Sequence, residues 1–275
     1  MFVQVSNAKL FASKSGPLNG TAILAIGGWI GSSELWLESL AALSDAYTTI
    51  SYDHRGSGLS SCNADSIRFE NMVADALAVL DAYGIQRCVL AAESAGAQTA
   101  LALAARSPDR VSHLVIVDGM YNPGIALESP TESDPFLQGL RNNYSATLEH
   151  FVQLCVPEVD CEHIKAWGRK ILARATPEAA IALRIVGSTT DVSEDIKSIR
   201  QPSLILHGSV DRIVPLEQGQ ALARTLPNAE FMILEGAGHV PTLTQPMRVA
   251  ETIRDFLRRH DGNAFVQTNP PSTNH

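Results

Sequence analysis

The sequence predicts an α/β domain whose sheet is mostly parallel and covered by helices on both faces. Apolar runs at 22–26 and 88–92, and a predominantly apolar one at 111–117, alternate with longer segments that have helical periodicity. A strand that reads as a continuous apolar run is typical of a parallel sheet buried on both sides, because a strand with one exposed face alternates instead. The length of 275 residues suits one large domain of this kind with an inserted subdomain.

The elements of the N-terminal third follow from the same patterns. Apolar residues alternate over the first dozen positions and predict two short strands joined by a turn. The first buried strand ends in Gly27-Gly28, and we expect Ser33 to cap the helix that follows. The next strand is predicted at 48–52 and a long helix at 69–83.

One region interrupts the alternation. Between 120 and 195 the apolar strand runs vanish and prolines recur, which predicts a helical insertion lying over the sheet. Its helix-like stretches are 136–156, 162–175 and 177–186. Residues 1–119 and 196–260 then make up the predicted α/β core, in which we expect strands at 203–206 and 230–234 and helices at 97–106, 216–226 and 247–259. Residues 261–275 are expected to be a disordered tail.

Charge and hydropathy exclude several functions. The formal net charge is −8, and beyond the Arg258-Arg259 pair there is no basic cluster of the kind that nucleic-acid binding needs. No stretch approaches the roughly 18 apolar residues of a membrane span. The first residues lack the basic segment and apolar run of a signal peptide. We therefore expect a cytoplasmic protein that binds neither nucleic acid nor membranes.

We expect no metal, nucleotide or flavin cofactor. The four cysteines form no C-x-x-C pair, as a zinc site would require, and they are too sparse for a disulfide scaffold. Cys155 and Cys161 could form a disulfide, but reduced thiols are the simpler interpretation. Gly56-Ser57-Gly58 is too short, and in the wrong place, for a dinucleotide-binding loop.

The strongest local motif is Ala92-Glu93-Ser94-Ala95-Gly96, between an apolar strand and an alanine-rich helix. In a sharp strand-to-helix turn the backbones crowd, so small residues are needed two positions before and after the central residue, whose side chain is exposed above the sheet. Ala92 and Gly96 are small, although Ala92 stands where glycine is usual. Taken alone, the motif fits a nucleophile, and it also fits a serine that caps a helix.

Two residues that follow predicted strands later in the chain strengthen the case for a nucleophile. Asp211 lies in the loop after strand 203–206, and His239 ends the segment Gly236-Ala237-Gly238-His239 after strand 230–234. A serine hydroxyl is a weak nucleophile at neutral pH unless a base within reach accepts its proton. The chain order Ser94, Asp211, His239 is one of the orders in which such a triad occurs.

With these residues the chain resembles the α/β-hydrolase superfamily, in particular its capped, esterase-like branch. Residues 27–32 (GGWIGS) are similar to the oxyanion loop of that family, residues 53–60 (DHRGSGLS) match its Asp-x-Arg-Gly-x-Gly-x-Ser stretch, and residues 106–111 resemble the link after its elbow helix. The resemblance covers residues 2–260. It implies the α/β-hydrolase fold, with a mostly parallel eight-stranded sheet, helices on both faces and a helical cap.

The resemblance also implies a role for each site residue. Ser94 would be the nucleophile, His239 the base and Asp211 the acid that orients it, while the backbone N–H groups of Trp29 and Ala95 would hold the oxyanion. The family usually has a histidine where this chain has glycine, at the start of the oxyanion loop. Because the expected donors are backbone groups, activity need not be lost.

Several assignments stay open at this point. Asp118, at the end of strand 111–117, is a rival orienting acid, and Asp211 could instead cap a helix. Glu93 could line the substrate pocket or satisfy local hydrogen bonds. The expected substrate contacts are Gly28, Glu93, Tyr121, Trp167 and Val240. We interpret as structural the residues His54, Arg55, His113 and His207.

The function expected from this pattern is hydrolysis of a small or medium carboxylic ester or lactone through an acyl-enzyme on Ser94. A cap of about 75 residues favours a small enclosed substrate over a polymer, and we expect a monomer or homodimer. The alternatives are a C–C bond hydrolase, a cofactor-free perhydrolase, or a ligand receptor built on the same fold. Glu93 and the Gly-Trp-Ile-Gly loop argue against the C–C hydrolases, and Ser94 argues against the Asp-dependent dehalogenases and epoxide hydrolases.

Overall fold

A computed structural model describes residues 1–121 and 134–261 of the chain. The predicted tail therefore lies almost entirely outside the described residues. No described helix combines the length and the apolar character that crossing a membrane would require.

The sheet is mostly parallel, as predicted. Eight strands form a continuous path in which β1, β2 and β4 are antiparallel neighbours and all later pairs are parallel. In spatial order the strands are β1 (Phe2–Val5), β2 (Ala8–Ser15), β4 (Thr48–Tyr52), β3 (Ala22–Ile26), β6 (Cys88–Glu93), β7 (Val111–Val117), β8 (Ser203–Gly208) and β9 (Ala229–Leu234). The short strand β5 (Ser61–Cys62) pairs with β2 beside this path.

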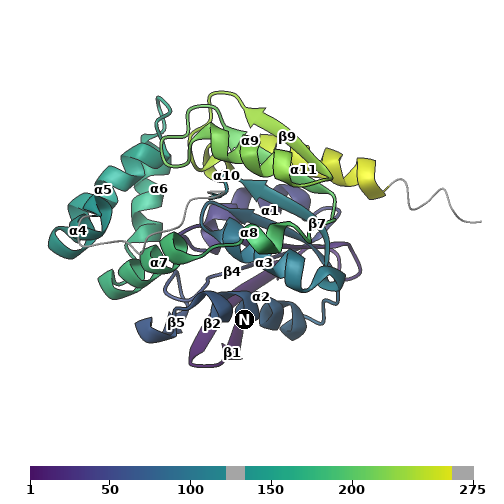
Figure 1. Cartoon of the computed structure of the whole chain (residues 1–275), viewed down its shortest axis with the longest axis horizontal. Helices are drawn as coiled ribbons and strands as arrows, with labels where there is room; N and C mark the ends of the chain where they lie inside the picture. Colours follow the sequence, from purple (N-terminus) through teal and green to yellow (C-terminus); the bar gives the residue numbers. More distant parts are fainter. Residues whose placement is uncertain (122–133, 262–275) are drawn as a thin grey trace, which may run out of the picture.

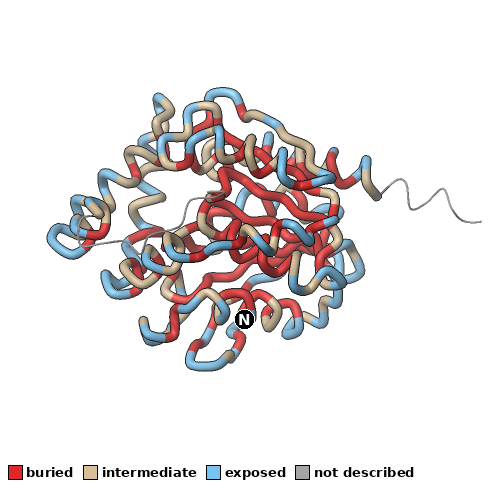
Figure 2. Tube along the Cα trace, in the orientation of Figure 1, coloured by how far each residue is buried: buried red, intermediate tan, exposed pale blue. Residues whose placement is uncertain are grey.

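Helices cover both faces of the sheet, so the central strands are apolar on both sides. In β3, Leu24 and Ile26 pack into the core on one face, whereas Ile23 and Ala25 pack into the core on the other. The first face is covered by α2 (Phe69–Ala82), α3 (Gly96–Arg106), α8 (Ser193–Ile196) and α9 (Leu216–Thr225). The second face is covered by α1 (Leu37–Leu43) and α11 (Pro246–Asp261). Figure 2 shows the resulting buried centre, with the exposed residues at the periphery.

The helix after β3 begins one residue earlier than expected. A 3₁₀ turn at Ser33–Trp36 precedes α1, and the side chain of Ser32 caps this turn by accepting a hydrogen bond from the Glu34 N–H. The Ser33 N–H donates instead to Oδ1 of Asp53, at 2.7 Å. The prediction that Ser33 is the cap was therefore wrong, because the aspartate of the neighbouring loop holds its backbone.

The insertion is helical in its described part and lies to one side of the sheet (Figure 1). Its helices are α4 (Pro135–Asn142), α5 (Tyr144–Cys155), α6 (Glu162–Leu172) and α7 (Pro177–Thr189). The stretch expected at 136–156 is therefore two helices, since Asn143 leaves the helical conformation and its side chain caps α5. Apolar residues of α5, α6 and α7 pack against Ile30, Ile67 and Met72 of the core.

Candidate active site

Ser94 lies in the sharp turn between β6 and α3. Its φ is +50°, a conformation that few non-glycine residues adopt and that is tolerated where the surrounding structure enforces it. A Cβ atom on Gly28 would lie 2.9 Å from the Ser94 Cβ, and one on Gly96 would lie 2.5 Å from the Gly27 carbonyl oxygen. Gly96 is thus required by the close approach of the Gly27 backbone, which is the crowding that the sequence predicted at that position, and Gly28 leaves room for the Ser94 side chain.

The structure brings the three residues of the expected triad together. The His239 Nε2 atom lies 2.8 Å from Ser94 Oγ, and its Nδ1 atom lies 2.8 Å from Asp211 Oδ2. The three residues follow β6, β8 and β9, whose carboxyl ends share one edge of the sheet. This is the edge at which open α/β sheets bind their ligands.

Asp211 is the acid that contacts the histidine, and it also orders its own loop. Its Oδ1 atom accepts hydrogen bonds from the N–H groups of Ile213, at 2.7 Å, and Val214, at 3.0 Å. Burial by itself would raise the pKa of Asp211, but the charge and hydrogen bond of His239, with these two N–H groups, lower it below its ordinary value. Asp211 is therefore ionised and holds the imidazole by its Nδ1 atom.

Asp118, the rival acid, lies behind Asp211 and not against the histidine. Its Oδ1 atom accepts from the Gly208 N–H at 2.7 Å, and its side chain is fully buried. Burial, followed by the negative charge of Asp211, raises the pKa of Asp118 well above its ordinary value. Asp118 therefore keeps its proton beside the ionised carboxyl group of Asp211.

The loop that carries Gly28 and Trp29 is held from both sides. The His54 Nε2 atom lies 2.8 Å from the Gly28 carbonyl oxygen, and the indole N–H of Trp29 donates to the Ala180 carbonyl of α7 at 2.9 Å. The Trp29 ring also packs edge-on against Phe136 of α4 and Phe151 of α5. His54 thus supports the loop from the core, and the insertion supports it from above.

The loop at 53–60 is locked as expected. The buried guanidinium group of Arg55 forms two hydrogen bonds with the Asp75 carboxylate, at 2.6 and 2.9 Å. His207 is also buried, and its Nε2 atom lies 3.0 Å from the Val214 carbonyl oxygen. Burial lowers the pKa of His207, so this ring is neutral and supports the loop that carries Asp211.

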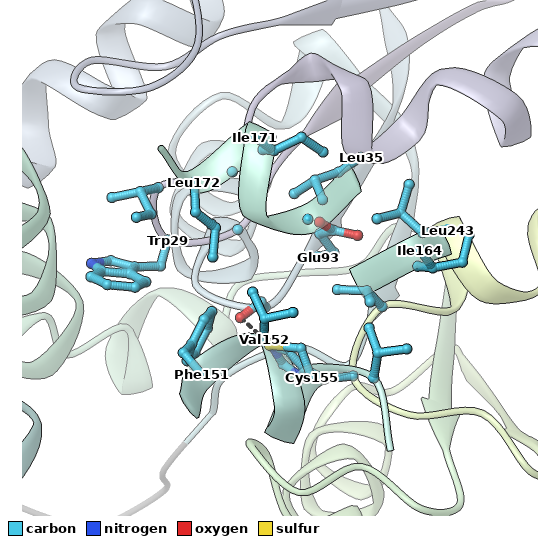
Figure 3. Close-up of a pocket in the computed structure, with 18 residues that line it drawn as sticks. Trp29, Leu35, Glu93, Phe151, Val152, Cys155, Ile164, Ile171, Leu172 and Leu243 are labelled. Carbon is cyan, nitrogen blue, oxygen red and sulfur yellow. Dashed lines mark hydrogen bonds between the residues drawn. The ribbon is translucent and has the colours of Figure 1, made fainter. Parts of the chain in front are cut away.

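Two cavities adjoin Ser94. The first, which we name the apolar cavity, is lined mostly by hydrocarbon side chains, and Figure 3 shows its lining. It extends from Ser94 and His239 between the core and helices α5 and α6, and its walls include Leu35, Glu93, Val152, Ile171, Leu172 and Leu243. The second cavity also begins at Ser94 and has a more polar lining that includes Arg184 and Gln218.

The expected substrate contacts divide into two groups. Gly28, Glu93 and Val240 line the apolar cavity. Tyr121 and Trp167 line neither cavity in the described part of the chain. Tyr121 is packed in the core and Trp167 is 43% exposed, so the structure does not bring these two side chains to either cavity. In α6 the cavity-lining stripe is Ile164, Gly168, Ile171 and Leu172, and Trp167 lies beside this stripe.

One polar contact of the site was missed from the sequence. The hydroxyl group of Thr242, on α10 (Pro241–Thr244), donates to Oε2 of Glu93 at 2.6 Å. The only sequence signal for it is its place three residues after His239. Glu93 itself is 1% exposed, and burial raises its pKa to about 7 against the lowering effects of this hydrogen bond, the charge of His239 and the nearby Gly28 N–H.

Among the described residues, Asp118, His207 and Asp211 form the group whose possible metal-ligand atoms lie within 4.8 Å of one another. Each of these side chains already takes part in the hydrogen bonds described above. In this group Asp211 contacts the His239 imidazole, while Asp118 and His207 contact backbone groups of Gly208 and Val214 beside it.

Comparison with known proteins places this geometry in a family. A family model described as "alpha/beta hydrolase fold" matches residues 21–178, and a second one described as "TAP-like protein" matches residues 173–264. The first match covers more than half of the chain. The chain therefore belongs to the α/β-hydrolase fold family, as its resemblance implied.

Individual relatives agree with this assignment. The chain is 30% identical over 242 residues to a protein of Pseudomonas savastanoi pv. phaseolicola named "Putative carbamate hydrolase RutD", covering 82% of this chain and 90% of the relative. It is 28% identical to the pimeloyl-[acyl-carrier protein] methyl ester esterase of Nitrosomonas europaea, covering 83% and 92%. The bromoperoxidase of Bacillus anthracis shares the fold, with a TM-score of 0.85, 23% identity and coverage of 94% and 99%.

Proposed function

We propose that this protein is a serine hydrolase that cleaves small or medium carboxylic esters, including cyclic esters, through an acyl-enzyme on Ser94. The observation that carries the proposal is the continuous chain of contacts from Ser94 Oγ through His239 to Asp211, each of 2.8 Å, at the inner end of an apolar cavity. A hydroxyl group needs such a base to become a useful nucleophile at neutral pH.

The first half-reaction forms the acyl-enzyme. Ser94 Oγ attacks the carbonyl carbon while its proton moves to His239 Nε2, and the carbonyl π electrons move to the oxygen. Asp211 stabilises the imidazolium ion that results. When the tetrahedral intermediate collapses, the bond to the leaving oxygen breaks, and His239 returns the proton to the departing alcohol. The second half-reaction repeats these steps with water and releases the acid.

Backbone N–H groups would stabilise the oxyanion during both steps. We assign this role to Trp29 and Ala95, since Gly28 packs directly against the Ser94 side chain and Ala95 precedes the first turn of α3. The amino end of a helix favours negative charge. Removing one oxyanion donor typically costs about 10²–10³ in rate.

The apolar cavity favours an ester with a hydrocarbon arm over a polar polymer. Helices α5 and α6 close this cavity above the serine, so the arm must fit between the core and the insertion. An enclosed apolar pocket with few polar groups is typical of small-molecule sites. The substrate is therefore proposed to be a small molecule.

The test is hydrolysis of p-nitrophenyl esters, from acetate to decanoate, by the wild type and by Ser94→Ala. We expect the variant to lose several orders of magnitude in kcat, because no other group replaces the nucleophile. Unfolding curves of both proteins control for stability. Equal rates in the two proteins would remove Ser94 from the mechanism, and an aryl carbamate in the same panel tests the activity that the name of one relative suggests.

A further inference from the structure

The apolar cavity holds one polar feature that the reaction itself does not use. Oε2 of Glu93 accepts from Thr242, but Oε1 is buried and, within residues 1–121 and 134–261, has no hydrogen-bond partner. Figure 3 shows the Glu93 carboxyl group among Leu35, Ile171 and Leu243, whose side chains are hydrocarbon. A buried oxygen without a partner costs about 1–3 kcal/mol and is rare in native proteins.

This cost is explained if a ligand completes the hydrogen bonding. Glu93 is the only carboxyl group among the described residues that line the cavity, and it precedes the nucleophile in the chain. Thr242 fixes Oε2, so that Oε1 is the atom left for a bound molecule. An oxygen in this position can accept a hydrogen bond from a donor on the substrate arm.

We propose that the arm of the substrate that enters the apolar cavity carries a neutral hydrogen-bond donor, such as a hydroxyl group, which binds Oε1 of Glu93. The proposal rests on the proposed function, in which Ser94 attacks an ester placed in this cavity. It adds the class of substrate, a hydroxylated aliphatic ester, and names Glu93 as the residue that selects it.

A neutral donor fits the cavity better than a cation. The walls are largely hydrocarbon, and burying an ammonium group costs several kcal/mol even when a carboxylate is close. Burial raises the pKa of Glu93 to about 7. Near neutral pH, Glu93 is therefore uncharged in a large fraction of the protein molecules and cannot offset the charge of a cation. In the neutral acid Oε2 still accepts from Thr242, so Oε1 carries the proton and donates it to the oxygen of the substrate hydroxyl group. A hydroxyl group can both donate and accept, so it can bind in both protonation states.

The proposal is tested by binding, so that it does not depend on turnover. The probes are alkanoate esters from butanoate to octanoate, each matched with its ω-hydroxy and ω-ammonio derivatives, and alkyl acetates carrying the same groups in the alcohol arm. Their Kd values are measured by calorimetry on Ser94→Ala. We expect at least one hydroxylated ester to bind about tenfold more tightly than its parent, which is the effect of one hydrogen bond made in place of an unsatisfied oxygen.

Two variants in the same background assign the preference. Glu93→Met has a similar volume without the acceptor, and we expect the ratio of parent to hydroxylated Kd to fall to about one. Glu235→Gln changes an exposed glutamate after β9 and should leave the ratio unchanged. Because the ratio compares two ligands on the same protein, partial unfolding of a variant does not alter it.

The preference should also respond to pH in a defined way. The titratable groups that face Glu93 are His239, Asp118 and Cys155. Ionisation of Glu93 makes Oε1 a stronger acceptor, so the preference for the hydroxyl group should rise between pH 6 and 8, and Glu93→Gln should remove this rise.

The outcomes separate this proposal from the proposed function. Equal Kd values for every hydroxylated and parent ester, tighter binding of the ammonium derivative, or a preference that survives in Glu93→Met would each overturn it. If wild type hydrolyses none of the esters but the Glu93-dependent preference is present, the serine hydrolase assignment fails while the recognition by Glu93 stands.

Discussion

The α/β core and the helical insertion contribute to the site in different ways. Ser94, Asp211 and His239 all come from loops at the carboxyl ends of core strands, with contacts of 2.8 Å between them. The insertion supplies one wall of the apolar cavity, through Val152 of α5 and Ile171 of α6, and no member of the triad. The reacting groups are thus set by the sheet, whereas the space left for a substrate is set largely by the insertion.

The largest effect on activity should come from a substitution in the α/β core. In Asp211→Asn the carboxylate that holds His239 Nδ1 is lost, so the imidazole can take the wrong tautomer and its protonated form is no longer stabilised. We expect kcat to fall by about 10⁴-fold. The exposed change Asp255→Asn is the matched control. If Asp211→Asn kept wild-type activity, the assignment of Asp211 over Asp118 as the orienting acid would be wrong.

A change in the insertion should alter selectivity and leave the chemistry intact. Val152→Phe fills part of the apolar cavity, so we expect kcat/KM for the longest tolerated ester to fall at least about tenfold, while that for acetate stays within a few-fold of wild type. The measurement is the profile of kcat/KM against chain length. Ile185→Phe, on the exposed side of α7, should leave the profile unchanged. A uniform loss at all chain lengths would show that α5 supports the catalytic groups themselves.

The smallest effect concerns the buried acid behind the triad. Burial and the charge of Asp211 raise the pKa of Asp118, so the folded protein keeps a proton that the unfolded chain loses above about pH 4. The contribution of Asp118 to the free energy of unfolding therefore falls as pH rises. Asp118→Asn keeps a donor toward Asp211 and has no proton to lose, so its stability relative to wild type should be higher at pH 8 than at pH 4.

Urea unfolding of both proteins at the two pH values measures this difference. The slopes of other titrating groups cancel in the comparison of wild type with Asp118→Asn. A difference in stability that is the same at pH 4 and pH 8 would show that Asp118 titrates normally in the folded protein. Because asparagine can accept from the Gly208 N–H and donate to Asp211, esterase activity should change little.

Local patterns predicted the strands and helices of the core and most of the helices of the insertion, but they did not predict what the insertion helices face. The strand at 111–117 has the predicted bounds, because its last four residues, Leu114 to Val117, are buried on both faces of the sheet and are all apolar. In the insertion, an apolar stripe indicates that one face of a helix is buried. It does not indicate whether that face contacts the core, a neighbouring helix or the cavity. Trp167 was therefore expected at the substrate although it is 43% exposed. The helix break at Asn143 was missed although asparagine is favoured at a helix N-cap and disfavoured in a helix interior.

The sequence by itself determined the fold class and the turn that carries Ser94, and it singled out His239 together with two candidate acids, Asp211 and Asp118. These conclusions follow from residue size, apolar runs and chain order, which can be read from the sequence without knowing the distances between segments. Only the tertiary structure decided that Asp211 rather than Asp118 contacts His239, and that Oε1 of Glu93 faces an apolar cavity without a partner among the described residues. Such choices depend on distances between side chains from different strands and helices, and those distances are fixed only when the core and the insertion pack together.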